Sequence, residues 1–124
     1  MKDKRRVLGE QRKRRHRRIR RKVRGTAERP RLVVTRSLKH IAAQLVDDDS
    51  QKTLAHVSST ARSLAVDGEG DSVKMNRAVA VGTEIARKAQ DVGATRVVFD
   101  RAGRLFHGRV KAVAEAARKG GLEF

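Results

Sequence analysis

The sequence predicts an α/β fold in which a single mixed sheet of about four strands packs with two helices, behind a basic N-terminal arm. Three observations predict it. Segments rich in β-branched and apolar residues recur between residues 31 and 59, two later segments show helical spacing, and positive charge is concentrated in the first 24 residues. With 124 residues, the chain is long enough for one domain. We expect an arm over 1–24, a hinge over 25–30 and an α/β domain over 31–124.

The net charge of +17 is distributed unevenly along the chain. Residues 1–24 hold fourteen Arg and Lys against two acidic residues, so the remaining hundred residues carry only +5. Such a basic run repels itself and cannot be buried, so without a partner we expect it to lack a fixed fold and to become helical once neutralised. It predicts a polyanion-binding arm whose cations are Arg12, Lys13, Arg14, Arg15, Arg17, Arg18, Arg20, Arg21, Lys22 and Arg24.

Composition restricts the partner. Arginine outnumbers lysine in the arm, which favours nucleic acid because guanidinium groups bind phosphate in bidentate fashion. No cysteine is present, and no apolar run approaches the length of a membrane span, so we expect an intracellular protein without membrane contact. Amphipathic membrane binding by the arm is the weaker reading, since Leu8, Ile19 and Val23 are its few apolar anchors. Three phenylalanines and no Trp or Tyr leave little room for base stacking.

Apolar patterning along residues 31–124 predicts the order β-β-β-α-β-α. Strands are expected over 31–37, 40–48 and 52–59, followed by a surface connection over 61–71, a helix from about 72 to 92, a strand over 95–100 and a helix over 108–119. On the first helix, we expect one face to approach the sheet closely, formed by Met75, Val79, Gly82, Ala86 and Ala89. On the last helix, we expect Val110, Val113, Ala114 and Ala117 to point inward.

The predicted topology is a sheet of order 3-2-1-4. A meander makes the third strand parallel to the first, and a helical crossover makes the fourth strand parallel to both. The free edge beside the first strand is the natural place for the fourth, although pairing at the other edge stays open. In this order the carboxyl ends of strands one and four lie side by side, which is where ligands usually bind in open α/β sheets.

The loops that leave these two ends are basic. They carry Arg36 and Lys39 on one side and Arg101, Arg104 and Arg109 on the other, together with His40 and His107. Gly108 opens the last helix, where unpaired N–H groups suit a phosphate. Simple turns explain Gly103 and Gly108 as well, and both histidines suit structural roles. No cysteine or paired carboxylate completes a metal set, so we expect neither metal nor cofactor.

Several segments of this sequence closely resemble a known family. The segments RS-KHI-AQ, FDR-G and HGRVKA-A-AAR-GGL-F, within residues 12–124, are similar to the bacterial-type large-subunit ribosomal protein number eighteen, a 5S rRNA-binding family. The resemblance implies a mixed α/β domain in the cytoplasmic ribosome, with 5S rRNA, 23S rRNA and neighbouring ribosomal proteins as partners in the central protuberance. It implies RNA contacts at the basic arm and at Arg36, Ser37, Lys39, His40, Arg101, His107, Gly108 and Arg109.

The sequence departs from the family pattern at a few positions. Ala42 stands where the family often has an aromatic, Arg104 and Phe106 stand where tyrosine is common, and Ala102 replaces the first glycine of FDRGG. These changes shift weight from stacking towards charge and 2′-hydroxyl contacts.

Two other function classes share features with this sequence. An RNase H-like enzyme needs clustered carboxylates to hold divalent metal, but the first strand has none and Asp100 stands among arginines, so we expect no enzyme and no small-molecule substrate. A general RNA- or DNA-coating, or chaperone-like, basic protein stays the alternative. Groove readers usually present a recognition helix, whereas these helices look amphipathic and sheet-packed.

Overall fold

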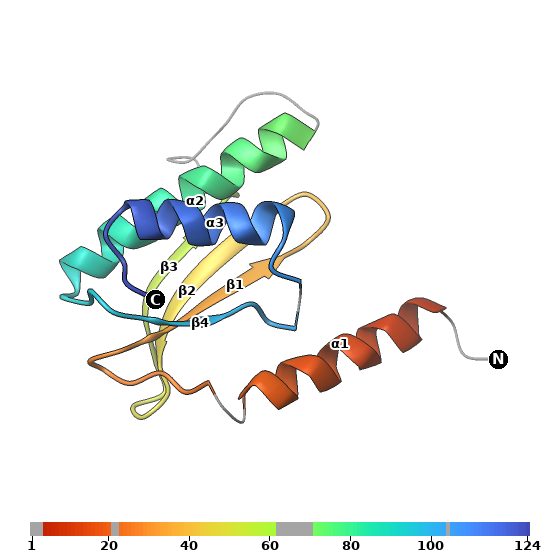
Figure 1. The fold of residues 1–124 in the computed structure, drawn as a ribbon, viewed down its shortest axis with the longest axis horizontal. Helices are drawn as coiled ribbons and strands as arrows, with labels where there is room; N and C mark the ends of the chain where they lie inside the picture. The colour runs from red at the N-terminus through yellow and green to blue at the C-terminus, as the bar shows by residue number, and fades with distance from the viewer. Residues whose placement is uncertain (1–3, 21–22, 62–70, 104) are drawn as a thin grey trace.

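The computed structural model describes residues 4–20, 23–61, 71–103 and 105–124 of the chain. Its elements are α1 (Lys4–Arg20), β1 (Arg31–Arg36), β2 (Ile41–Asp47), β3 (Lys52–Ser58), α2 (Asp71–Asp91), β4 (Val98–Asp100) and α3 (Gly108–Lys119). The strands form one mixed sheet of order β3-β2-β1-β4, and α2 and α3 lie together over one face of it (Figure 1). The predicted fold class and strand order are confirmed. Most of the connection predicted over 61–71 lies outside the described residues.

Strand β1 holds the sheet together from a central position. It pairs antiparallel with β2 from Arg31↔Val46 to Arg36↔Ile41. On its other side it pairs parallel with β4, where Arg31 and Val33 lie opposite Val98 and Asp100. The fourth strand therefore occupies the edge beside the first, which decides between the two edges that the sequence left open.

Strand β4 is shorter than the sequence predicted. The expected strand began at residue 95, but pairing with β1 begins only at Val98. Before that point the chain pairs with the C-terminal segment: the Val97 N–H donates to the Glu123 carbonyl at 3.1 Å, and the Glu123 N–H donates to the Thr95 carbonyl at 2.9 Å. The segment after α3 thus takes the backbone hydrogen bonds that an extended β4 would have given to the sheet.

The core lies between the sheet and the two helices. Side chains alternate along β2, where Ile41, Ala43 and Leu45 are buried and their neighbours half-buried. The predicted inward face of α3 is confirmed, because its four residues are all buried. Together with β1 and α2 they form one cluster, whose largest fully buried apolar side chains are Leu32, Val34, Ile41, Leu45, Val81, Ile85, Val97, Val110 and Val113.

The predicted inner face of α2 was partly wrong. Met75 and Val79 are 39% and 44% exposed, whereas the buried stripe contains Ala78, Val81, Gly82, Ile85, Ala86 and Ala89. The reason is that α2 packs on α3 as well as on the sheet. A Cβ at Gly82 would overlap the Val113 carbonyl and lie 2.7 Å from the Ala116 Cβ. The close approach that small residues permit is therefore between two helices, not between helix and sheet.

Residues Lys4–Arg20 of the basic arm form the helix α1, the conformation that the sequence favours once the charges of the arm are neutralised. Arg, Lys and Gln have high helix propensities, which explains why the segment is helical. In Figure 1, α1 lies apart from the α2–α3 layer and passes near the loop that follows β4. Arg15 contacts this loop, donating from Nε to the Gly103 carbonyl at 3.1 Å.

We predict that Gly82→Ala destabilises the domain by about 1–3 kcal/mol, the usual cost of overpacking. In an open helix the same change stabilises by about 1 kcal/mol, so the sign of the effect reports the α2–α3 contact. Urea unfolding followed by circular dichroism measures it. Asn76→Ala, at an exposed position of the same helix, is the control and should not destabilise. A Gly82→Ala protein that is more stable than the wild type would contradict the contact.

Candidate nucleic-acid interface

The loops that leave β1 and β4 meet at one end of the sheet. Because the two strands are parallel neighbours, their carboxyl ends point the same way. A side-chain contact joins the loops directly: Nη2 of Arg109, in the first turn of α3, donates to the Ser37 carbonyl at 3.4 Å. The predicted juxtaposition of the two basic loops is therefore present in the structure.

The first loop is a tight turn fastened to the sheet. The Ser37 N–H donates to the His40 carbonyl at 2.8 Å, and the His40 N–H donates to Ser37 Oγ at 3.2 Å. Ser59 secures the turn from the end of β3. Its Oγ accepts the Ile41 N–H at 3.0 Å and lies 3.2 Å from His40 Nδ1. These bonds hold the exposed side chains of Arg36 and Lys39 on a fixed backbone.

Ser59 is a residue that sequence reasoning missed. It is 7% exposed and satisfies two groups of the first loop. Its contacts give His40 a structural partner, as the sequence allowed. Nothing in the local sequence marks Ser59, because its role depends on the pairing of β2 with β3, which brings Ser58 opposite Ala42.

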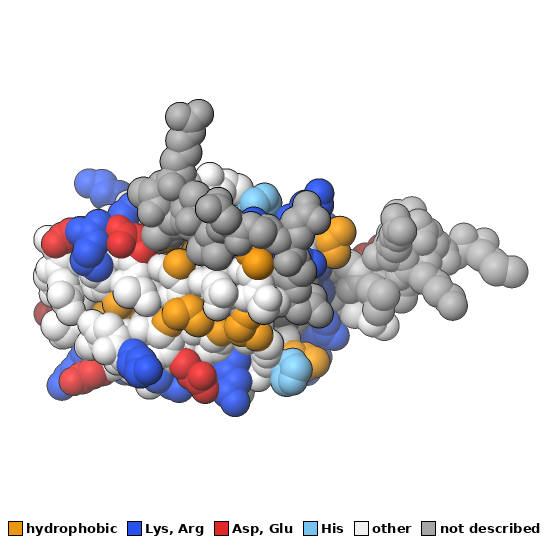
Figure 2. All heavy atoms as spheres, turned by 90° about the horizontal axis from the view of Figure 1, so that it is seen from above, with side chains coloured by type: hydrophobic (Ala, Val, Ile, Leu, Met, Phe, Trp, Pro, Cys, Tyr) orange, Lys and Arg blue, Asp and Glu red, His pale blue; other side chains and the backbone are white. Residues whose placement is uncertain are grey.

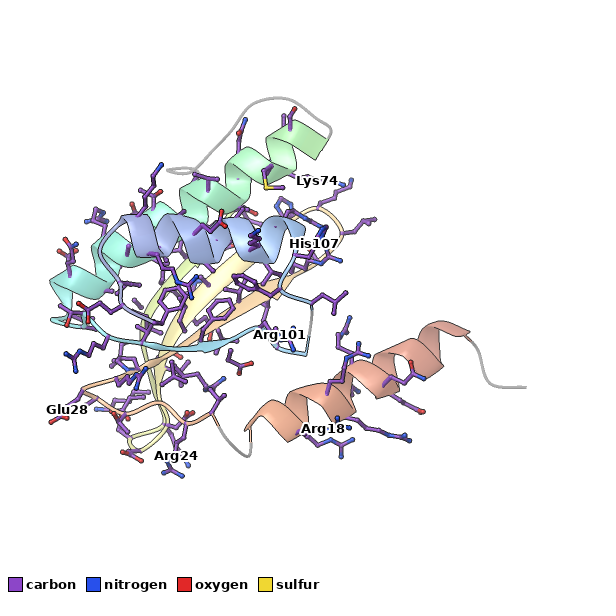
Figure 3. The ribbon with its side chains drawn as sticks, viewed as in Figure 1. Arg18, Arg24, Glu28, Lys74, Arg101 and His107 are labelled. Atoms are coloured by element: carbon purple, nitrogen blue, oxygen red, sulfur yellow. The ribbon has the colours of Figure 1, made fainter. Side chains whose placement is uncertain are left out.

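The second loop begins with a buried carboxylate. Asp100 is fully buried, and its Oδ1 accepts the Ala102 N–H at 2.8 Å. Ala102 and Gly103 have φ values of 54° and 78°, so two successive left-handed residues turn the chain sharply. This turn sets Arg101, which is half-buried at the end of β4 (Figure 3). Ala102 adopts this backbone without the conformational freedom of a glycine.

The second loop ends at the N-terminus of α3. His107 is the N-cap residue; it is exposed, and its side chain makes no capping hydrogen bond. Gly108 follows with φ 57°, the left-handed conformation that its glycine accommodates. No acidic residue stands in the first turn of α3. His107, Gly108 and Arg109 therefore present a helix N-terminus with a cation beside it, a combination that suits phosphate oxygens.

The same end exposes apolar side chains that the sequence analysis did not select. Leu38 and Leu105 are 79% and 77% exposed, one in each loop. Phe106 is 39% exposed and packs edge-to-face on Phe99, with ring centroids 5.8 Å apart. Phe99 in turn stacks on Phe124 at 5.4 Å. Phe106 is thus the most exposed of the three phenylalanines.

The arm adds cations along α1. Lys13, Arg14, Arg15, Arg17 and Arg18 are exposed and Arg12 is half-buried. Figure 3 shows Arg18 on α1 and Arg24 near the sheet, on the side of the domain opposite α2 and α3. The Arg24 guanidinium pairs with Asp49, at 2.7 Å, and this hydrogen bond raises the pKa of Arg24. The side chain of Arg20 and the whole of Arg21, Lys22 and Arg104, all predicted to bind RNA, lie outside what the structure describes.

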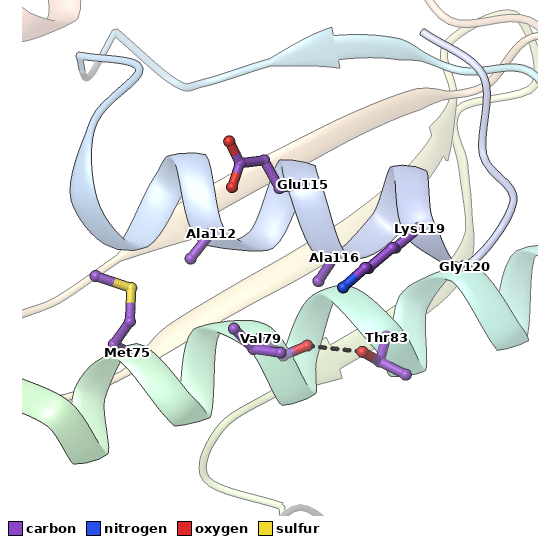
Figure 4. Close-up of a pocket in the computed structure, with 8 residues that line it drawn as sticks. All are labelled: Met75, Val79, Thr83, Ala112, Glu115, Ala116, Lys119 and Gly120. Atoms are coloured by element: carbon purple, nitrogen blue, oxygen red, sulfur yellow. Dashed lines mark hydrogen bonds between the residues drawn. The ribbon is translucent and has the colours of Figure 1, made fainter.

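An open groove lies between α2 and α3. It has a volume of about 730 Å³, and Met75, Val79, Ala112 and Ala116 give it an apolar floor (Figure 4). Its Thr83 hydroxyl is engaged with the Val79 carbonyl at 3.0 Å. Figure 2 looks onto this side and shows apolar side chains between charged ones of both signs. The charged residues Glu115 and Lys119 also line the groove.

The described residues contain neither a metal-binding cluster nor a membrane-spanning helix. No group of three or more His, Asp or Glu side chains there is arranged to hold a metal ion. Among the same residues, no helix has both the length and the apolar character needed to cross a bilayer.

The sequence of this chain is similar to those of known proteins. Residues 6–124 match the family described as ribosomal L18 of archaea, bacteria, mitochondria and chloroplast. The chain is 55% identical over 112 residues to the large ribosomal subunit protein uL18 of Synechococcus sp. (strain JA-2-3B'a(2-13)), covering 90% of this chain and 92% of the relative. It is 56% identical over 110 residues to the protein of the same name from Bifidobacterium animalis subsp. lactis (strain AD011), covering 89% and 87%. The chain therefore belongs to the ribosomal L18 family.

Proposed function

We propose that this chain is a structural constituent of the large ribosomal subunit that binds 5S rRNA and helps to attach it to 23S rRNA in the central protuberance. Family membership supports the ribosomal role. The observation that carries the RNA-binding site is the joining of two basic loops at the carboxyl ends of β1 and β4, through the Arg109–Ser37 contact. The neighbours in this assembly are the two rRNAs and adjacent ribosomal proteins, in the cytoplasm.

The loops and the arm have different tasks in this proposal. The loops are fixed by hydrogen bonds to the sheet, so the spacing between Arg36, Lys39 and Arg101 is constant and suits one RNA shape. Ser37, His40, His107, Gly108 and Arg109 complete this surface with polar groups for phosphates and 2′-hydroxyls. The arginines and lysines of the arm reach phosphates of any sequence, so they supply affinity with little discrimination.

The chain is not an enzyme, since its family consists of structural ribosomal proteins. The structure adds a physical reason against metal-dependent phosphate chemistry at Asp100. Both oxygens of this carboxylate are engaged, one by the Ala102 N–H and the other by Arg31 Nη1 at 2.8 Å. This carboxylate is fully buried and paired with a cation of the chain, so it presents no exposed oxygen at the surface where metal-dependent phosphate chemistry would take place.

We predict that Arg101→Ala lowers the preference for 5S rRNA over an unrelated folded RNA by about tenfold, the usual value of a charge-assisted hydrogen bond. Replacing Arg14 and Arg18 together by alanine should weaken binding of both RNAs about equally. These two are exposed, whereas Arg15 contacts Gly103 and is a poorer choice. Circular dichroism first confirms that each variant is folded. Filter binding then measures the affinity of each variant for both RNAs at one salt concentration. An arm variant that changes the ratio while Arg101→Ala leaves it unchanged would reverse the assignment, and wild-type protein that binds duplex DNA as well as 5S rRNA would favour a general coating protein.

We also predict a steep dependence of binding on salt. If about eight phosphates are neutralised, log K against log salt has a slope of roughly −6 to −7. Replacing Arg14, Arg17 and Arg18 by glutamine should flatten this slope by about 2 to 3 units. The reason is that fewer phosphate contacts form, so fewer counterions are released on binding. Asn76→Ala serves as the matched control on α2, with no expected change. A slope that the triple arm variant leaves unchanged would show that the arm does not contact phosphate.

A further inference from the structure

A buried guanidinium connects the arm, the sheet and the second loop. Arg31, at the start of β1, lies between two carboxylates. Its Nε and Nη2 donate to the two oxygens of Asp48, each at 3.1 Å, and its Nη1 donates to Asp100 at 2.8 Å. The side chains of Arg31, Asp48 and Asp100 are 12%, 13% and 0% exposed. Burial lowers the pKa of Arg31, but the hydrogen bonds that its guanidinium donates to both carboxylates outweigh it and the pKa is raised.

Asp48 also holds the end of the arm. Its Oδ2 accepts the Gly25 N–H at 2.7 Å, and its own N–H donates to the Gly25 carbonyl at 3.0 Å. A Cβ at Gly25 would overlap the backbone nitrogen of Arg31, so the chain lies directly against β1. Next along the turn, Asp49 pairs with Arg24. The chain that enters the domain from the arm is thus clamped to the turn between β2 and β3 at two successive residues.

Asp100 connects Arg31 to the second loop. While one oxygen binds Arg31, the other fixes the Ala102 N–H and so the turn that sets Arg101. The next residue, Gly103, accepts the hydrogen bond from Arg15 of the arm. Through Arg31, the network therefore reaches both the place where the arm joins the domain and the loop that the arm contacts.

Stability alone is a poor explanation for such a network. Removing three charges from water is costly, and apolar residues of similar volume often serve stability equally well or better. What apolar residues do not provide is direction, since hydrogen bonds from a planar guanidinium fix the groups around it at defined angles. The three side chains hold two segments that bear the proposed RNA contacts, and none of the three belongs to the proposed contact surface.

We propose that Arg31, Asp48 and Asp100 are positioning residues that fix the direction of the arm relative to the two loops, so that arm and loops bind one RNA as a unit. This inference rests on the proposed function. A clamped arm is held near the phosphates that flank the loop contacts, which raises its effective concentration there. An arm on a loose joint keeps its charges but spreads them over many directions.

A double-mutant cycle on the full chain tests this coupling. The arm variant carries Arg14→Gln, Arg17→Gln and Arg18→Gln, and it is combined with Asp48→Asn. Affinity for 5S rRNA is measured for the four proteins at one salt concentration. We expect the arm substitutions to cost at least about fivefold less affinity in the Asp48→Asn background than in the wild type. Equal costs in both backgrounds would overturn the proposal, because a purely stabilising network leaves the contribution of the arm unchanged.

Charge is controlled by Glu28→Gln, at an exposed position near the same joint (Figure 3). Like Asp48→Asn, this variant removes one negative charge and so raises the net charge by one. It should bind RNA no more weakly than the wild type and leave the arm's contribution to affinity intact. If Asp48→Asn does not fold, Asp49→Asn decides instead. Its ion pair is exposed, so the fold is retained, and we expect a reduction in the arm's contribution of at least about twofold. No reduction there would then overturn the proposal.

The two proposals fail in different ways. A wild-type protein that binds 5S rRNA and an unrelated folded RNA equally well contradicts the proposed function. In that case the double-mutant cycle is measured with the unrelated RNA. A smaller affinity cost of the arm substitutions in the Asp48→Asn background would still support the positioning role of the network. A preference for 5S rRNA that persists while the arm's contribution is the same in every background contradicts the clamp alone.

Discussion

The parallel pairing of β1 with β4 is the constraint on which the proposed binding surface depends. These strands are far apart in the sequence, and only their pairing brings the loop after Arg36 beside the loop after Asp100. The contact from Arg109 to the Ser37 carbonyl, at 3.4 Å, also joins the two loops. Without the pairing, the same cations would be scattered over the surface and would bind phosphate without a preferred shape. The arm lies outside this strand pairing and its cations suit phosphates of any sequence, which is why affinity and selectivity are assigned to different parts of the chain.

Much of the fold follows from the sequence because it depends on local patterns. Alternation in β2, helical spacing in α3 and the right-handed crossover rule together predict the order 3-2-1-4 and the meeting of the loops. The errors come from contacts between distant segments. Met75 and Val79 share a helical face with Gly82. Only Gly82 is buried by α3, whereas Met75 and Val79 stay partly exposed. The early part of the predicted fourth strand pairs with Glu123, which lies in the last four residues.

The cations of the candidate site could be predicted from the sequence, but the residues that hold them in place could not. Arg36, Lys39, Arg101 and Arg109 stand out because turn residues and like charges occur together in the sequence. The groups that hold them do not stand out. Ser59 acts across a strand pair, and Arg31 resembles an ordinary basic residue at a strand start until Asp48 and Asp100 close around it. Side chains that support a site through tertiary contacts leave no local pattern, since their partners are many residues away.

Burial also explains how a carboxylate fits beside a surface proposed to bind phosphates. An exposed Asp100 would repel the RNA and weaken the effect of Arg101. Inside the sheet its charge is compensated at 2.8 Å by Arg31, so little of it reaches the surface, while its hydrogen bond still shapes the loop. At the joint, Asp48 and Asp49 each pair with a cation of this chain; the Asp48 pair is largely buried and the Asp49 pair is exposed. The acidic residues of this region thus organise the positive ones, and the arm and loops keep the excess charge that a polyanion requires.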